Sequence, residues 1–162
     1  MLEIHPTASI SPLAELESSV RGTRIVVGEH SSIDAFVKIK PTGGMGDLII
    51  GPNCIINSGC VLYTGNGIVM GQGVAIAANC TLAPVNHAYA DASRPIRDQG
   101  FLPSRGGIII GNDVWIGANC VVLDGATIGE GAVVAAASLV RGQLKPYTVY
   151  GGNPLRVLGQ RR

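Results

Sequence analysis

The sequence is poor in charge, poor in aromatic residues and free of long hydrophobic runs. Charged residues make up 14% of the 162 residues, aromatic residues 4%, and the formal net charge is +1. With no basic stripe and no acidic tail, this composition argues against nucleic-acid binding and against a disordered tail. No apolar stretch approaches the roughly 20 residues that a membrane helix needs, and the N-terminus lacks the basic and apolar regions of a signal peptide. We therefore expect a single domain without a membrane span, located in the cytoplasm.

What the sequence has instead is an aliphatic residue at every sixth position. A helix would repeat its apolar face every 3.6 residues and a plain strand every second residue. A period of six predicts short strands joined by turns, and three such hexapeptides make one coil. Coils of this kind stack about 5 Å apart, as strands do in any sheet, and together they bury a continuous aliphatic column. Three for each coil, the positions are Ile4, Ile10, Leu16, Val27, Ile33, Ile39, Ile50, Ile56, Leu62, Met70, Ile76, Leu82, Ile110, Ile116, Val122, Ile128, Val134 and Val140.

A second, smaller interior position is expected four residues after each of these aliphatic residues. All four cysteines fall there, and none belongs to a Cys-x-x-Cys pair. We therefore interpret them as small buried hydrophobic residues with reduced thiols, rather than as metal ligands or nucleophiles. The positions are Ala8, Ala14, Val20, Ser31, Val37, Gly43, Cys54, Cys60, Asn66, Val74, Cys80, Asn86, Val114, Cys120, Ala126, Ala132, Ser138 and Leu144.

The coils are interrupted by inserts that all fall at the same corner. Three inserts are short, whereas the fourth, residues 88–109, is long and begins immediately after His87. A long excursion from an otherwise economical repeat is typical of a functional loop. The other two histidines, His5 and His30, lie in the first two coils without such a context and are interpreted as surface residues.

The repeat ends before Pro146. We expect residues 1–145 to form the coiled domain and residues 146–162 to form a cap over its open last coil, where an uncovered edge would favour aggregation. The stretch NPLRVLGQ predicts a short helix, with Asn153 as its N-cap and Pro154 at its first position.

The hexapeptides in IIIGNDVWIGANCVVLDGATIGEGAVVAAASLV, together with the terminal YGGNPLRVL, resemble those of the hexapeptide-repeat acyltransferases. Sugar O-acetyltransferases of the maltose, galactoside and colanic-acid types look nearest, and the xenobiotic (streptogramin) acetyltransferases are also similar. The resemblance implies an all-β fold, a left-handed parallel β-helix of about six coils with a long inserted loop. It also implies acetyl-CoA as co-substrate, no permanently bound cofactor or metal, and a homotrimer with active sites in the grooves between subunits.

The same resemblance assigns roles to particular residues. In these relatives the catalytic histidine ends a coil just before an extended loop, which matches His87. An acceptor-binding asparagine precedes that histidine by 30 residues, which matches Asn57. Trp115, the only tryptophan, is expected either to border the acceptor or to pack in the trimer groove.

Four further residues are assigned to the coenzyme. By resemblance, Ala118 and Ala136 line the CoA groove and Arg156 contacts the CoA phosphates. The family's lysine is replaced by Gly142 here, so Arg141 is expected to take over its contact. A second arginine of the family is also missing, since its position holds Gly159.

The expected chemistry is acetyl transfer to a hydroxyl group. A histidine suits the role of general base, and it can return the proton to the CoA thiolate. No serine or cysteine nucleophile stands out, so we expect direct transfer in a ternary complex with a saccharide acceptor. Loop residues that could orient His87 or read the acceptor are Tyr89, Asp91, Arg94, Arg97, Asp98 and Phe101.

Three alternatives bear on this hypothesis. N-acetylation of an amino nucleotide sugar, or of a xenobiotic, would use the same base. A carbonic anhydrase of the γ type would need three histidines around one zinc ion, and His87 has no second histidine in its half of the chain. A scaffold without activity would not need the arrangement of His87, the long loop and Trp115.

Overall fold

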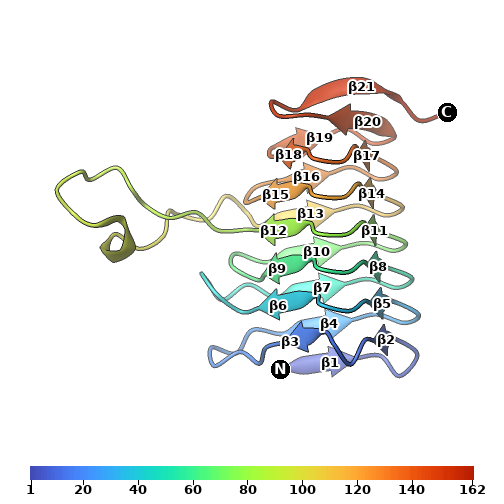
Figure 1. Cartoon of the computed structure of the whole chain (residues 1–162), viewed down its shortest axis with the longest axis horizontal. Coiled ribbons are helices and arrows are strands. Elements are labelled where there is room, and N and C mark those ends of the chain that lie inside the picture. The colour runs from blue at the N-terminus through green and yellow to red at the C-terminus, as the bar shows by residue number, and fades with distance from the viewer.

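The computed structural model describes all 162 residues as a prism of three parallel sheets, with one long loop projecting from its side (Figure 1). The first sheet contains β1 (Leu2–Ile4), β4 (Ile25–Val27), β7 (Leu48–Ile50), β10 (Ile68–Met70), β13 (Ile108–Ile110), β16 (Thr127–Ile128) and β19 (Gln143–Leu144). The second contains β2 (Ser9–Ile10), β5 (Ser32–Ile33), β8 (Ile55–Ile56), β11 (Ala75–Ile76), β14 (Trp115–Ile116), β17 (Val133–Val134), β20 (Thr148–Gly151) and β21 (Arg156–Gln160). The third contains β3 (Glu15–Leu16), β6 (Lys38–Lys40), β9 (Val61–Tyr63), β12 (Thr81–Ala83), β15 (Val121–Leu123) and β18 (Leu139–Val140).

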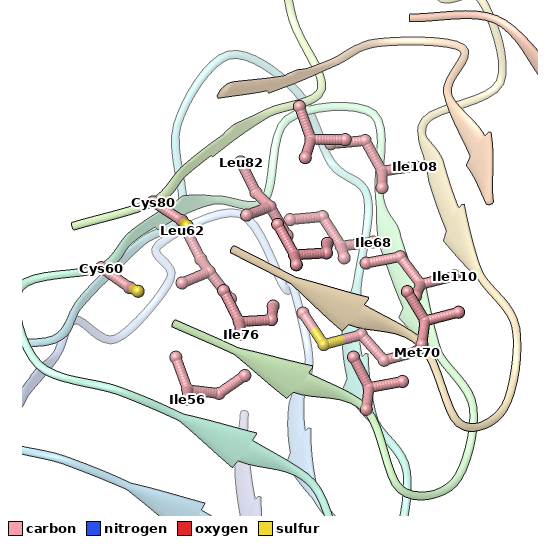
Figure 2. Close-up of a cluster of buried hydrophobic side chains, with 14 of the residues drawn as sticks. Ile56, Cys60, Leu62, Ile68, Met70, Ile76, Cys80, Leu82, Ile108 and Ile110 are labelled. Carbon is pink, nitrogen blue, oxygen red and sulfur yellow. The ribbon is translucent and has the colours of Figure 1, made fainter. Parts of the chain in front are cut away.

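The strand register confirms the period of six. All eighteen aliphatic positions lie in register with their equivalents in neighbouring coils, as in the run Ile56, Ile76 and Ile116 of the second sheet. The third sheet has six strands and the first has seven, so the chain makes six full coils and begins a seventh. From the second coil onward these side chains are at most 2% exposed, and they stack into one core (Figure 2).

Each coil turns three corners, which we name by the sheets that they join: first–second, second–third and third–first. Neighbouring coils approach closely at these corners. At the first–second corner, for example, a Cβ atom on Gly28 would lie 2.7 Å from the carbonyl carbon of Gly51 in the next coil. All four inserts leave the prism at the third–first corner, as expected.

The second interior position is confirmed where the corner is regular and wrong where an insert begins. All four cysteines are free thiols at 0% exposure. Val20, by contrast, is 98% exposed, and Asn66 and Asn86 are only partly buried. These three residues lie at the third–first corner, where the chain swings outward and no longer lines the core.

The buried thiols are expected to be unreactive in the folded protein. Burial raises the pKa of Cys54, and contact with the Cys80 thiol together with burial raises the pKa of Cys120. Contact with Cys80 lowers the pKa of Cys60, so that thiol is protected by its 0% exposure instead. A raised pKa leaves less thiolate at pH 8, and the thiolate is the reactive form. A colorimetric disulfide reagent at pH 8 should therefore label no thiol rapidly in the native protein and all four after denaturation. Fast labelling of the folded chain would contradict the buried assignment.

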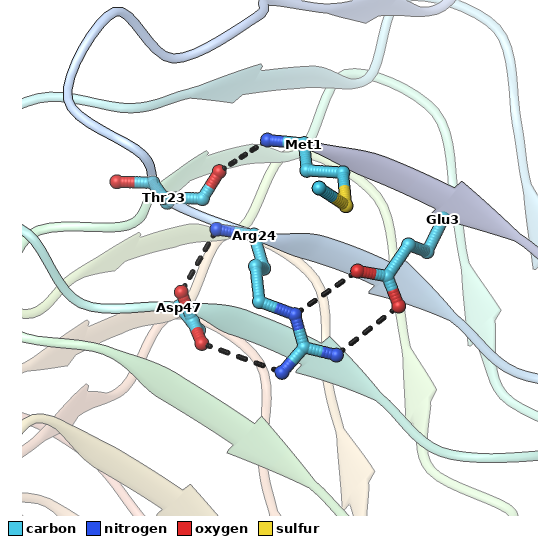
Figure 3. A network of polar contacts seen from close by, with 5 residues as sticks. All are labelled: Met1, Glu3, Thr23, Arg24 and Asp47. Atoms are coloured by element: carbon cyan, nitrogen blue, oxygen red, sulfur yellow. Dashed lines mark hydrogen bonds and ion pairs between the residues drawn. The ribbon is translucent and has the colours of Figure 1, made fainter.

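A polar network ties the first coil to the next two (Figure 3). The Arg24 guanidinium bonds both carboxylate oxygens of Glu3, at 3.0 and 3.1 Å, and the Arg24 amide donates to Asp47 at 2.8 Å. The hydrogen bond from Arg24 lowers the pKa of Glu3. Because these side chains are 38% to 50% exposed, the network orders the end of the prism more than it stabilises the fold.

The expected C-terminal helix is wrong. The residues after Asn153 turn back, and β21 pairs antiparallel with β20, from Thr148 opposite Gln160 to Gly151 opposite Arg156. Without β21, β20 would be the edge of the second sheet. An extended strand can satisfy the free backbone groups of that edge, whereas a helix would satisfy only its own. The resulting cap hairpin covers the last coil (Figure 1).

The long loop is shorter than the sequence suggests. Ile108 and Ile109 belong to β13, so the excursion ends at Gly107. Its only helical segment is the 3-10 turn η1 (Ile96–Asp98), and the structure contains no helix with the length and apolar character to cross a membrane.

Candidate active site

The long loop leaves the prism as an antiparallel hairpin that begins at His87. The Ala88 amide donates to the Gly100 carbonyl at 3.0 Å, and the Leu102 amide donates to the Asn86 carbonyl at 2.8 Å. Between these bonds, His87 and Phe101 form an antiparallel bridge. The backbone of His87 is thus held by the return leg of its own loop.

The tip of the loop is organised by its own hydrogen bonds. Gln99 donates to the carbonyls of Asp91 and Arg94, Asp91 accepts from Ser93, and Arg94 donates to the Asp98 carbonyl at 2.6 Å. The Ser93 hydroxyl and amide lower the pKa of Asp91. None of these tip residues bonds His87, so within one chain they do not orient its ring.

The His87 side chain is exposed and has no hydrogen-bond partner. Its ring packs against Phe101, with the ring centroids 4.6 Å apart and the planes inclined at 42°. Of the six loop residues considered from the sequence, Phe101 is therefore the one in contact with the His87 ring. Both imidazole nitrogens remain available for a substrate.

Two pockets adjoin His87. The arginine pocket, about 290 Å³, is lined by Asn86, His87, Tyr89, Leu102, Arg105, Leu123, Asp124 and Arg141. The aromatic pocket, about 300 Å³, is lined by Thr42, Gly43, Tyr63, Ala83, Val85, His87 and Phe101. The first opens toward the C-terminal coils and the second toward the N-terminal coils, so His87 stands at the boundary between them.

Asp124 fastens the return leg of the loop to the prism. Its carboxylate is 4% exposed and accepts hydrogen bonds from the Arg105 amide at 2.8 Å, the Gly107 amide at 2.9 Å and the Asn66 side chain at 3.2 Å. Sequence reasoning missed this residue. The available signal was its position, because Asp124 lies at the third–first corner one coil after His87.

The arginine pocket has a positive character. Neither Arg105 nor Arg141 makes an ion pair, and the oxygens of Asp124, the only carboxylate in the lining, already accept three N–H groups. Two guanidinium groups are therefore free to contact an anionic or strongly polar ligand next to His87.

Comparisons with known proteins identify the family to which this fold belongs. The family model "Bacterial transferase hexapeptide (six repeats)" matches residues 107–142, and "Hexapeptide repeat of succinyl-transferase" matches residues 47–84. A chloramphenicol acetyltransferase of Agrobacterium fabrum is 31% identical over 156 residues, which cover 90% of this chain and 72% of the relative. The galactoside O-acetyltransferase of Escherichia coli is 30% identical over 148 residues, covering 91% of this chain and 70% of the relative.

The chain belongs to the hexapeptide-repeat acyltransferase family. Both of these relatives are acetyltransferases, and the chain is an acetyltransferase. A solved structure with the same fold is a variant of AntD, an N-acyltransferase from Bacillus cereus, in complex with dTDP-4-amino-4,6-dideoxyglucose and coenzyme A. It is 25% identical, covers 99% of this chain and 84% of its own, and has a TM-score of 0.82. The architecture is therefore the expected left-handed parallel β-helix.

This hexapeptide-repeat acyltransferase divides its predicted site residues between two corners. His87 and Arg141 line one pocket at the third–first corner. Asn57, Ala118 and Ala136 instead lie at the second–third corner, between β8 and β9, β14 and β15, and β17 and β18.

The remaining two predicted residues lie elsewhere. Trp115 is 53% exposed on the outer face of the second sheet, and Arg156 is exposed on the cap hairpin. Within one chain the structure thus brings His87 together only with Arg141.

Proposed function

We propose that this chain transfers the acetyl group of acetyl-CoA to a hydroxyl of a saccharide, with His87 as the general base. The observation that carries the proposal is the His87 imidazole, free of partners at the boundary between two pockets. The arginine pocket has the positive character suited to the coenzyme, and the aromatic pocket has the aromatic side chains suited to packing against an acceptor.

Acetyl-CoA is proposed to lie along the third–first corner from His87 to the cap hairpin. The arginine pocket shares Arg141 with a further pocket of about 290 Å³ under that hairpin, where Leu139, Tyr150 and Pro154 are among the lining residues. With the thioester of acetyl-CoA beside His87, the pantetheine arm would lie in the arginine pocket and in the pocket under the cap hairpin. Arg141 and the exposed Arg156 would then meet the phosphates. The bound coenzyme A in AntD supports this use of the fold.

A homotrimer would bring the two groups of predicted residues together. The outer faces of the first sheet and of the C-terminal half of the second sheet are largely apolar, with Val69, Ile109 and Trp115 each about half exposed. On the third sheet, by contrast, Lys38 forms ion pairs with two glutamates. If the first sheet of each copy packs on the second sheet of the next around a threefold axis, the ring closes and the charged third sheet faces solvent.

That packing sets the corner of His87 beside a neighbour's second–third corner. The neighbour would contribute its Asn57 on the acceptor side, and its Ala118 and Ala136 along the coenzyme. One active site would thus be formed by two copies.

The proposed reaction is a single displacement. One nitrogen of His87 accepts the proton of the acceptor hydroxyl as its oxygen attacks the thioester carbon, and a tetrahedral intermediate forms. The C–S bond then breaks, and the histidinium returns the proton to the CoA thiolate. An acyl-cysteine intermediate is disfavoured because all four thiols are buried at 0% exposure.

The test is acetyl-CoA turnover, followed as free CoA thiol, with a panel of neutral saccharides, amino nucleotide sugars and chloramphenicol. We expect the highest kcat/KM for a saccharide, with the acetyl group recovered as an O-acetyl ester of that saccharide. Turnover confined to amines would instead support N-acetylation. A specific observation also favours an antibiotic acceptor, namely the Tyr63 and Phe101 rings of the aromatic pocket together with the chloramphenicol acetyltransferase relative.

The trimer makes a separate prediction. Light scattering should give the mass of three 16.7 kDa chains for the wild type. Trp115→Glu should lower that mass, since a carboxylate on an apolar interface must be desolvated without a partner. Thr81→Glu, in β12 of the third sheet that faces solvent in this assembly, is the control and should leave the mass unchanged. A wild-type chain that stays monomeric at micromolar concentration would contradict the assembly.

A further inference from the structure

The second–third corner changes its chemistry halfway along the prism. In each coil, one residue directly follows the inward-facing aliphatic residue of the second sheet, and these residues stack into a column along the corner. The amide of each one donates to a carbonyl of the next coil: Ser11 to Ile33 at 2.8 Å, Asp34 to Ile56 at 2.9 Å and Asn57 to Ile76 at 3.0 Å. In coils one to three the column is polar, and in coils four to six it consists only of small residues, Ala77, Gly117 and Ala135.

A second column beside it changes in the same way. The outward residues of the second sheet are Ser9 and Ser32 in the first two coils and become apolar from Ile55 onward. The column then continues through Ala75 to Trp115. The switch at the corner comes between the third and fourth coils, and the fourth coil is the one that ends at His87. In these two columns, serine, aspartate and asparagine side chains are therefore confined to the coils on the N-terminal side of His87.

The two polar columns line a pocket of about 210 Å³, which we call the polar corner pocket. Its lining residues are Ser9, Ser11, Ser32, Ile33, Asp34, Ile55 and Asn57. The hydroxyls of Ser9 and Ser32 have no hydrogen-bond partner. Because the Asn57 amide nitrogen donates to the Ile76 carbonyl at 2.8 Å, its oxygen is directed away from that bond and remains free.

Asp34 supplies the charge of this pocket. Its carboxylate accepts from the Ser58 hydroxyl at 2.6 Å and from the Ala35 amide at 2.7 Å. These two bonds lower the pKa of Asp34, so the group is ionised at neutral pH. A carboxylate has about four lone-pair sites, which leaves acceptor capacity toward the pocket.

We propose that the polar corner pocket is a subsite for a second sugar residue of an extended saccharide acceptor. Vicinal hydroxyls would donate to Asp34, the serine hydroxyls and the Asn57 oxygen would complete the polar contacts, and Ile55 would cover the apolar face of a sugar ring. Two coil spacings along this corner span about 10 Å, which is longer than one pyranose ring. The inference rests on the proposed function for the reaction itself, and it adds that the acceptor is an oligosaccharide.

The test is equilibrium binding by calorimetry to the full chain in the absence of acetyl-CoA. The probes are maltotriose, cellotriose and triacetylchitotriose, each compared with its monosaccharide. At least one trisaccharide should bind the wild type more tightly than its monosaccharide. Asp34→Ala should reduce that preference about ten- to 100-fold, as expected for the loss of hydrogen bonds to a charged group.

Two further variants make the test specific. Ser32→Ala removes a hydroxyl that has no partner in the protein, so it should fold normally and reduce the preference by a smaller factor. Glu29→Ala removes an exposed carboxylate from the same coil at a different corner, and the preference should remain. Melting temperatures of all variants would show that each one folds.

Five outcomes are decisive. Absence of any preference for a trisaccharide in the wild type, or a preference that survives in both Asp34→Ala and Ser32→Ala, overturns the subsite. If Asp34→Asn retains the trisaccharide preference and Asp34→Ala loses it, the pocket recognises sugar hydroxyls, as proposed. If both variants lose the preference equally and the wild type binds amino sugars more tightly, the pocket is a cation site and the proposed sugar subsite is overturned. If the preference behaves as expected but no saccharide is acetylated, only the proposed function fails.

Discussion

Replacing His87 by alanine is expected to lower kcat for acetyl transfer by about 10²- to 10⁴-fold, the usual contribution of a general base. The KM for acetyl-CoA should change little, because the proposed coenzyme contacts lie at Arg141 and beyond. The fold should persist, since the bridge to Phe101 uses the backbone of His87 and the side chain bonds no other residue. His87→Gln should be equally inactive, because its amide retains a polar group but cannot accept the proton.

The measurement is CoA thiol release at saturating acetyl-CoA, with melting temperatures recorded in parallel. His5→Ala is the matched control, because His5 is also exposed and bonds only the neighbouring Thr7. Unchanged turnover in His87→Ala, with the same acceptor as the wild type, would remove His87 from the mechanism. A loss of equal size in His5→Ala would mean that the assay reports stability rather than catalysis.

The repeat determined the fold because one rule applies to every coil. An aliphatic residue at every sixth position can be buried only if each coil stacks on the next, so the register of Ile56, Ile76 and Ile116 follows from spacing alone. The burial of the cysteines follows from the same rule, since a thiol four residues after such a position points inward. The corner that carries the inserts was predictable too, because all of them interrupt the period at the same phase.

Prediction failed where contacts between distant segments decide the structure. The segment after Asn153 has the capping residues of a helix, yet the free edge of β20 outweighs this local preference. The hairpin form of the long loop depends on bonds between Asn86 and Leu102 that no period encodes. The spacing between Asn57 and His87 likewise carries no information on which corner each residue occupies, and they prove to lie on different ones.

Asp124 is the clearest case of a residue whose importance only the structure reveals, and its removal has the second-largest expected effect. In Asp124→Ala the Gly107 amide is left buried without an acceptor, and the bonds to Arg105 and Asn66 are lost as well. A buried donor left unpaired costs about 1–3 kcal/mol, and bonds to charged groups contribute about 1.5–3 kcal/mol. We expect the free energy of unfolding to fall by about 2–4 kcal/mol.

The change should also reach the active site, because the return leg carries both Phe101 and Arg105. Once released, the leg would no longer hold Arg105 in the arginine pocket or Phe101 against the His87 ring. Turnover should therefore fall even at temperatures where the prism is fully folded. Hydrogen exchange should show faster exchange of the Arg105 and Gly107 amides while the amides of the coil strands stay protected.

A control in the same loop separates this local effect from a general one. Asp98 is exposed at the loop tip, and its carboxylate pairs only with the adjacent Arg97 at 3.4 Å. Asp98→Ala should change stability by less than about 1 kcal/mol, as for other exposed ion pairs, and should leave the exchange of Arg105 and Gly107 unaltered. If Asp124→Ala behaves like this control, the carboxylate does not anchor the loop. The geometry of the His87 pockets would then have to depend on the hairpin bonds alone.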